Sequence, residues 1–265
     1  MYANTFDRYE TGSSLIHRLD PRLKIVLTVL FIISNVTLPD GAWLAFLLAW
    51  GLVLETNILA KLRWDYALKR AFIVLPFALA AITSVFTIPG EPVFALPLGS
   101  WQPVATEAGL TRFGSIMVRS WLSVQMAILL TATTQFPDLM HALRHLRMPS
   151  LLVAVVSFMY RYLFVLADET MRLLRAREAR SARWPDVRGG GSVVWRARVA
   201  GNMVGQLFLR SYERSDRVYN AMLARGYQGY VQTLNPHTME MRDWVIGGLA
   251  GCILLILQLV GYRLG

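Results

Sequence analysis

Long apolar runs alternate with short polar or basic segments along the chain, a pattern that predicts several membrane-spanning helices. A span needs about 20 predominantly apolar residues. The first two runs are shorter than this, so their ends must include flanking residues. The predicted spans cover residues 23–38, 42–54, 71–88, 113–134 and 244–260.

Turn and cap signals set the edges of the first two predicted helices. Asp20 is placed to cap the first helix, with Pro21 at its first position, where the missing N–H costs nothing. Residues 13–22 could form a short interfacial segment before it. Pro39-Asp40-Gly41 is a turn signal, so the first two spans form a tight hairpin.

The middle of the chain contains a long loop, a fourth span and a short helix. The loop starts at Pro89 and has no Lys or Arg before Arg112. Arg119 and Gln125 interrupt the fourth span. Arginine is costly in lipid, so we expect Arg119 to lie near a helix end or to face a partner. A short helix follows from Pro137 to about Arg147.

Residues 151–167 are apolar enough to cross the membrane, but the charge distribution argues against a crossing. Cytoplasmic loops of membrane proteins are enriched in Lys and Arg. If the N-terminus is cytoplasmic, a crossing here would place the thirteen arginines at positions 172–242 outside. We therefore expect 151–184 to be a helix that lies along or dips into the membrane. The N-terminus is then cytoplasmic and the C-terminus outside.

A second long helix is predicted from about Val193 to Arg225. Apolar residues recur on one face at the 3.6-residue period, and Glu213 precedes Arg217 by four residues, a favourable helical pair. Gly226 is a natural C-terminal cap. The apolar face is formed by Val204, Leu207, Phe208, Val218 and Met222.

Composition supports a polytopic membrane protein. The 265 residues have a mean hydropathy of +0.42, and 55% are hydrophobic against 17% charged. A net charge of +10 could suggest nucleic acid, but basic cytoplasmic loops account for it better. Cys252 is the single cysteine, so no internal disulfide can form. The polar start of the chain does not resemble a cleavable signal peptide.

Two similar tripeptides stand out in the arginine-rich stretch 159–226. Ala179-Arg180-Ser181 and Ala224-Arg225-Gly226 each fall near the end of a predicted long helix. Basic helix ends are favoured by the helix dipole and by anionic lipid headgroups. Alternatively, small neighbours let each arginine dock into an acidic groove of a partner, because its fork binds carboxylates with two hydrogen bonds.

The residues give weak support for a metal site or an active site. His141 and His145 stand four apart on a predicted helix, as metal ligands do, but only Asp138 is near them in sequence. Asp168 and Glu169 could form a catalytic acid pair, although we expect them to pair with Arg172 or to cap the long helix. Nothing matches a phosphate-binding glycine loop, a nucleophile triad or a metalloprotease helix.

With these residues in view, the chain resembles the transmembrane T component of energy-coupling factor (ECF) transporters, of the CbiQ type associated with cobalt or nickel uptake. The resemblance covers nearly the whole chain. Ser181 departs from the family's Ala-Arg-Gly, which leaves Ala176-Arg177-Glu178 as a competing register for the first tripeptide. The stretches that carry the resemblance are 17–22, 159–166, 176–181 and 221–227.

The resemblance implies a non-catalytic scaffold that binds no cofactor itself. Two Arg-bearing coupling helices would dock on two cytoplasmic CbiO-like ATPase subunits, which bind ATP. A CbiM-like S component, with a small CbiN-like subunit as a further candidate, would bind cobalt or nickel. The implied coupling residues are Ala179, Arg180, Ser181, Ala224, Arg225 and Gly226, with Arg177 and Glu178 as secondary candidates and Val204, Leu207 and Phe208 packing on the S component or membrane.

The sequence therefore predicts an all-α polytopic protein of the bacterial inner membrane, with about five transmembrane helices and two long coupling helices. We expect a membrane domain over 1–149, a coupling-helix domain over 150–235 and a C-terminal transmembrane helix in 236–265. Two other functions stay open. One is a T component for vitamin uptake, and the other is a membrane-embedded enzyme acting on lipid or phosphate substrates through Asp168, Glu169 and His141.

Overall fold

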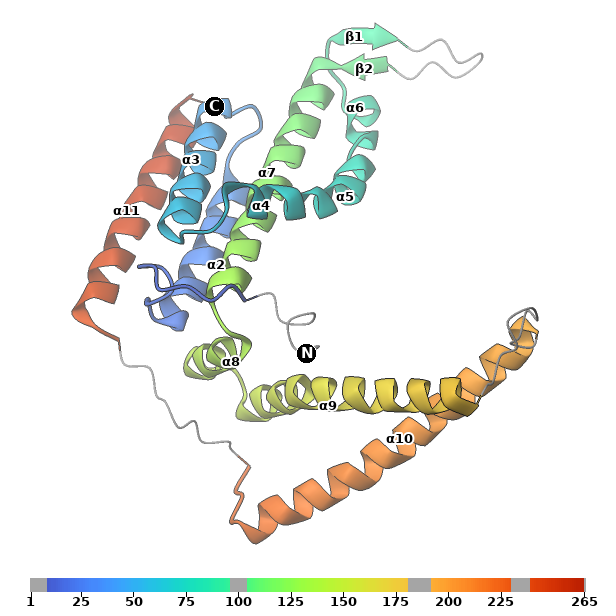
Figure 1. Ribbon diagram of the computed structural model, residues 1–265. Coiled ribbons are helices and arrows are strands. Elements are labelled where there is room, and N and C mark those ends of the chain that lie inside the picture. The colour runs from blue at the N-terminus through green and yellow to red at the C-terminus, as the bar shows by residue number, and fades with distance from the viewer. Residues whose placement is uncertain (1–8, 96–103, 181–191, 230–238, 265) are drawn as a thin grey trace. The chain divides into compact units, whose positions relative to one another are not determined.

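The computed structural model describes residues 9–95, 104–180, 192–229 and 239–264 (Figure 1). The chain divides into two compact units. Residues 7–142 and 235–265 form what we call the membrane unit. Residues 143–234 belong to the other, the long-helix unit, together with 1–6. Each is described by itself.

Four helices form the centre of the membrane unit, and they match four of the five predicted spans. Asp20 caps the first of them as expected: its side chain accepts a hydrogen bond from the Arg22 backbone N–H at 2.8 Å. The helices are α2 Pro21–Thr37, α3 Trp43–Leu59, α7 Glu107–Thr133 and α11 Met241–Leu264.

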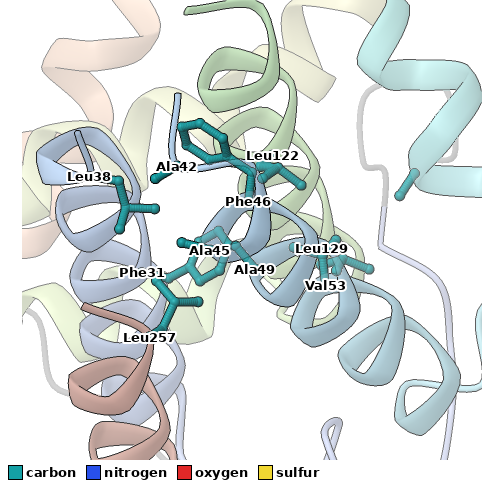
Figure 2. Close-up of a cluster of buried hydrophobic side chains, with 11 residues drawn as sticks. Phe31, Leu38, Ala42, Ala45, Phe46, Ala49, Val53, Leu122, Leu129 and Leu257 are labelled. Carbon is teal, nitrogen blue, oxygen red and sulfur yellow. The ribbon is translucent and has the colours of Figure 1, made fainter. Parts of the chain in front are cut away.

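Small side chains on α3 let the other three helices pack closely around it (Figure 2). Ala45, Ala49 and Val53 repeat every four residues on one face of α3, and each is at most 1% exposed. Phe31 of α2, Leu122 of α7 and Leu257 of α11 pack against this face. The sequence spacing thus places the core on α3.

The predicted third span, 71–88, is wrong as a continuous helix. The chain instead forms α4 Trp64–Ala71, a 3₁₀ turn η1 Phe72–Val74, α5 Leu75–Ala80 and α6 Thr83–Thr87. Pro76 explains the first break, since its ring excludes the carbonyl of Phe72 four residues earlier and it has no N–H to donate.

The predicted loop after Pro89 contains a short hairpin that the sequence analysis missed. Strand β1 Pro92–Ala95 pairs antiparallel with β2 Val104–Thr106, with Phe94 opposite Ala105 and Ala95 opposite Val104. Thr106 then caps α7, accepting a hydrogen bond from the Gly109 N–H at 3.1 Å. Because of this cap, α7 begins six residues before the predicted start at 113.

The long-helix unit is built on α9 Ser150–Arg180 and α10 Val193–Ala224, which follow the short helix α8 Phe136–His145. Both long helices match their predicted extents within the described residues. Among those residues, three helices are long and apolar enough to cross a membrane, namely α7, α9 and α11, and α3 is a shorter apolar helix. The chain is an all-α membrane protein, apart from the small hairpin.

Candidate functional site

The first predicted coupling tripeptide falls at the edge of the described part of α9. Arg180 is the last described residue of this helix, and both Ala179 and Arg180 are exposed. Ser181, the third member, lies outside the described residues. In the competing register, Arg177 is half-buried and Glu178 is exposed.

The second tripeptide forms the end of α10, and its geometry is well defined. Arg225 is the C-cap residue, and Gly226 has a φ of +81°. The Gly226 N–H donates to the Leu223 carbonyl at 2.9 Å, and the Tyr227 N–H donates to the Met222 carbonyl at 3.0 Å. These two bonds define a Schellman motif, so the predicted glycine cap is confirmed. The cap fixes where the exposed Arg225 leaves the helix.

One ion pair connects the two long helices. The guanidinium of Arg210 on α10 donates to the Glu169 carboxylate of α9, with an N–O distance of 2.6 Å. Sequence reasoning expected Glu169 to pair with Arg172 or to cap the helix, which was wrong because the partner is 41 residues away. The expected pair of Glu213 and Arg217 does form, at 3.9 Å.

The two tripeptides lie far from this ion pair and from one another. At 1.5 Å per residue, Arg180 lies ~16 Å along α9 from Glu169, and Arg225 lies ~22 Å along α10 from Arg210. The helices run in roughly opposite directions, so their C-terminal ends point to opposite sides of the long-helix unit (Figure 1). One partner groove cannot easily hold both arginines.

The apolar face predicted for α10 is largely uncovered within the described part of the chain. Val204 is 68% and Phe208 67% exposed, and Leu207 is half-buried. None of the residues of α10 is buried. A pocket of about 260 Å³ separates α10 from α9, lined by Met159 and Tyr162 on one helix and Arg214 on the other. The apolar face is therefore open to lipid or to another protein.

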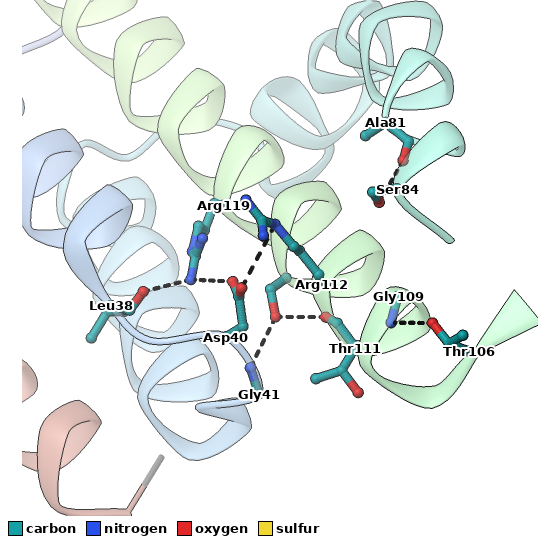
Figure 3. A network of polar contacts seen from close by, with 11 residues as sticks. Leu38, Asp40, Gly41, Ala81, Ser84, Thr106, Gly109, Thr111, Arg112 and Arg119 are labelled. Carbon is teal, nitrogen blue, oxygen red and sulfur yellow. Dashed lines mark hydrogen bonds and ion pairs between the residues drawn. The ribbon is translucent and has the colours of Figure 1, made fainter. Parts of the chain in front are cut away.

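Arg119, the arginine within the fourth predicted span, has two partners near the end of its neighbour helix (Figure 3). Its guanidinium pairs with Asp40 at 2.8 Å and donates to the carbonyl of Leu38, the C-cap of α2. The Gly41 N–H donates to the Ser115 hydroxyl at 3.0 Å. Of the two expectations for Arg119, the one that it faces a partner is confirmed, whereas the residue lies in the middle of α7 and not near its end. The contacts fix the turn between α2 and α3.

A second polar cluster, which sequence reasoning missed, surrounds Lys24 at the other end of α2. Lys24 is 7% exposed, and its ammonium donates to the His17 carbonyl at 3.2 Å and to the Thr133 carbonyl at 3.0 Å. Asp20, Asp138 and Asp243 are near enough to act on it electrostatically. The available signal was a lysine inside an apolar run. This cluster holds the starts of α2 and α11 and the end of α7 together.

The metal and enzyme interpretations gain no support from the geometry. No three His, Cys, Asp or Glu side chains gather as metal ligands in the part of the chain that the structure describes. His141 is buried on α8, and Glu169 is held by Arg210. Asp168 is exposed.

Comparison with known proteins identifies the family. Residues 12–237 match the model of the CbiQ family, described as cobalt transport protein. The energy-coupling factor transporter transmembrane protein EcfT of Lacticaseibacillus paracasei is 29% identical over 94% of this chain and 97% of its own. EcfT of Leuconostoc gelidum is 30% identical over 85% of this chain and 84% of its own.

An uncharacterized protein of Methanocaldococcus jannaschii is 26% identical over 90% of this chain and 80% of its own. The family is one of transporter membrane components rather than enzymes. The helical membrane architecture agrees with this match. The chain belongs to the CbiQ family and is the transmembrane component of an energy-coupling factor transporter.

Proposed function

We propose that this chain is the non-catalytic scaffold of an ECF-type importer for cobalt or nickel. It transmits the ATP-driven movement of two cytoplasmic ATPase subunits to a substrate-binding S component. The family description as cobalt transport protein supports the metal, and the EcfT names of the relatives support the kind of complex. The chain itself needs no cofactor in this function, because ATP is bound by the ATPases and the metal by the S component.

One observation carries the proposal: one ion pair joins two long helices that each carry an exposed arginine, Arg180 in the last described turn of α9 and Arg225 at the C-cap of α10. Arg180 and Arg225 would each dock on one ATPase subunit, and their positions at opposite sides of the unit suit two separate subunits (Figure 1). Arg180 is the better candidate than Arg177 for the first site, because Arg180 is exposed and Arg177 is half-buried.

The same geometry explains how movement at the ATPases would reach the membrane. A rigid helix turns as a whole, so a shift at Arg225 moves the exposed Val204 and Phe208 on the same helix. An S component resting on this face would be displaced in turn. Small shifts at one site become large movements when packed elements have two discrete arrangements.

Co-purification tests the docking role. The complete chain is expressed with its ATPase subunits as the wild type, Arg180→Glu, Arg225→Glu and the double variant. We expect the double variant to lose both ATPases, because an arginine removed from a desolvated carboxylate groove costs about 3–5 kcal/mol. Arg196→Glu, an exposed arginine in the first turn of α10, is the matched control and should retain them. Full retention by the double variant would contradict the docking role.

Uptake measurements test the substrate. Cells that carry the complete transporter should accumulate cobalt or nickel. Cells that carry the Arg180→Glu plus Arg225→Glu variant should not accumulate the metal. Vitamin uptake without metal uptake would favour the alternative T component. The names of the EcfT relatives state no substrate, so this measurement decides between metal and vitamin.

The proposed orientation has a cytoplasmic N-terminus and an external C-terminus. In a Cys252→Ser background, a cysteine at Thr11 should react with a membrane-impermeant thiol reagent only after the cells are opened. A cysteine at Arg263 should react in intact cells. The reverse pattern would overturn the orientation.

A further inference from the structure

An apolar pocket lies between the four central helices of the membrane unit. Its volume is about 220 Å³. It is lined by the first halves of α2 and α11, the last turns of α3 and α7, and the segment before α2. The pocket therefore occupies one end of the unit, the end that the positive-inside rule assigns to the cytoplasm.

The pocket reaches the outer surface of the unit. Leu15, Leu59 and Leu249 all line it, and they are 49%, 45% and 61% exposed. An apolar cavity of ~150 Å³ already excludes water and takes up an apolar guest. At this depth the protein is surrounded by hydrocarbon, so the apolar group available to enter the pocket is a lipid acyl chain. Filling the pocket recovers dispersion contacts that an empty space forfeits.

Basic residues lie beside lining residues in the sequence, at the end of the pocket where a headgroup would lie. Lys61 directly follows the lining residue Ala60, and Arg18 stands between the lining residues Ile16 and Leu19. Arg242 is close to Arg18, because its guanidinium donates to the Arg18 backbone carbonyl at 3.3 Å. All three basic side chains are exposed.

Carboxylates are also present and limit the net positive charge. Glu240 pairs with Arg242 at 3.5 Å, and Glu55 lines the pocket about two turns before Lys61. In the described residues, Arg18 and Lys61 have no ion-pair partner. These two cations are the natural partners for a phosphate.

We propose that the pocket binds one glycerophospholipid, with an acyl chain between α2, α3, α7 and α11 and the phosphate at Arg18 and Lys61. The lipid joins four helices, at the end where the Lys24 cluster holds α2, α7 and α11 together. It acts as a structural ligand of the membrane unit, and the inference does not depend on the proposed docking of Arg180 and Arg225.

Lipid titration of the purified full-length chain, followed by native mass spectrometry, tests the proposal. The probes are palmitoyl-oleoyl-phosphatidylglycerol and palmitoyl-oleoyl-glycerol, which has the same chains without the phosphate. We expect one tightly bound phospholipid per chain. Ala250→Leu extends a lining side chain into the pocket and should weaken the binding of both lipids. Cys252→Leu adds bulk to the same helix at an exposed position and should leave the binding of both lipids unchanged.

The headgroup contact is tested separately. Arg18→Gln plus Lys61→Gln should lower the affinity for phosphatidylglycerol by on the order of tenfold or more. The affinity for palmitoyl-oleoyl-glycerol should not change. Arg263→Gln, at the other end of α11, is the matched control. Soluble glycerol phosphate should not compete, because the acyl chain supplies much of the affinity. Competition by it would contradict the proposed lipid.

A measurement on the wild type keeps the proposal open to refutation if Ala250→Leu does not fold. A phosphatidylglycerol with a diazirine at the end of one chain should label Met126 and Leu254, which line the pocket. Labelling confined to the outward-facing Leu255 and Leu259 would overturn the proposal.

Equal lipid binding by Ala250→Leu and Cys252→Leu would overturn the proposal as well. Thr56→Leu repeats that test with a lining residue of α3.

Discussion

The Glu169 carboxylate and the Arg210 guanidinium meet at 2.6 Å, and this pair joins α9 to α10 in the long-helix unit. Glu169 is largely covered, with 18% of its side chain exposed, whereas Arg210 is 53% exposed. A hydrogen-bonded pair of this kind is worth more than a fully exposed one, which contributes 0–1 kcal/mol. The pair therefore contributes to holding the two helices together.

We predict that removing this pair strongly reduces the rate of transport but lowers the free energy of unfolding only slightly. Glu169→Gln and Arg210→Met should each cost about 1 kcal/mol in the stability of the long-helix unit. A double-mutant cycle on melting temperature in detergent measures the coupling between them. ATPase-dependent uptake should fall even where the ATPases still co-purify, since the helices no longer move together.

The Glu213–Arg217 pair is the matched control for this prediction. Both side chains are 68% exposed and lie on one helix, so their coupling energy should be about 0.3–0.5 kcal/mol. Arg217→Met should leave uptake unchanged. Equal effects of Arg217→Met and Arg210→Met would mean that the inter-helix pair has no special role.

Gly226→Ala should destabilise the end of α10 and disturb the second coupling site. Gly226 has a φ of +81°, and nothing lies within 4 Å of a Cβ placed there, so the cost is one of backbone conformation alone. The left-handed region costs a residue with a Cβ about 1–2 kcal/mol. We expect less ATPase to co-purify with Gly226→Ala than with the wild type.

Gly226→Asn is the control, because asparagine tolerates the left-handed conformation. It should retain more ATPase than Gly226→Ala does. If Asn and Ala reduce co-purification equally, the left-handed backbone conformation is not the cause, which would contradict the prediction.

Arg147→Gly should stabilise the protein. Arg147 has a φ of +66° and occupies the position where Gly226 sits in α10, with the Met148 N–H donating to the Leu143 carbonyl at 3.2 Å. Glycine adopts this conformation without a clash, so we expect a gain of about 0.5–1 kcal/mol after its larger loss of chain entropy. Differential scanning fluorimetry in detergent should show a rise of a few degrees. Arg147→Ala keeps the Cβ, so an equal rise there would show that charge and not conformation was limiting.

Lys24→Met should be strongly destabilising. The change leaves the His17 and Thr133 carbonyls without this donor and removes the positive charge that faces Asp20, Asp138 and Asp243. Breaking a buried charge cluster by removing one partner costs about 3–5 kcal/mol. The melting temperature should fall by more than with Lys69→Met, a substitution at an exposed lysine on α4. A smaller fall than that of Lys69→Met would contradict the structural role of Lys24.

Local chemistry near a helix end was predictable from the sequence. Asp20 caps α2 and Gly226 caps α10 as expected, because capping depends on residues only two to five positions apart. The position of Arg225 at the end of α10 follows from the same short-range signals. Their role in docking stays a prediction.

Contacts between distant segments were not predictable. Arg119 needed a partner, but only packing of α7 beside the α2–α3 turn selects Asp40. The ion pair of Glu169 with Arg210 likewise depends on how two long helices cross. The break of the third span was readable from Pro76, but the hydropathy of residues 71–88 dominated the interpretation. Hydropathy reports the environment of a segment and not the continuity of its helix.

The bare surface of α10 has a consequence for the abundance of the protein in a cell. A helix without a buried side chain gains little stability from its own chain, so a partner that binds α10 in the proposed complex would stabilise it. The folded fraction of the long-helix unit should then rise with the amount of partner subunits present. Copies made in excess should be removed by proteases, which keeps the subunits of the transporter in proportion without a separate control of their synthesis.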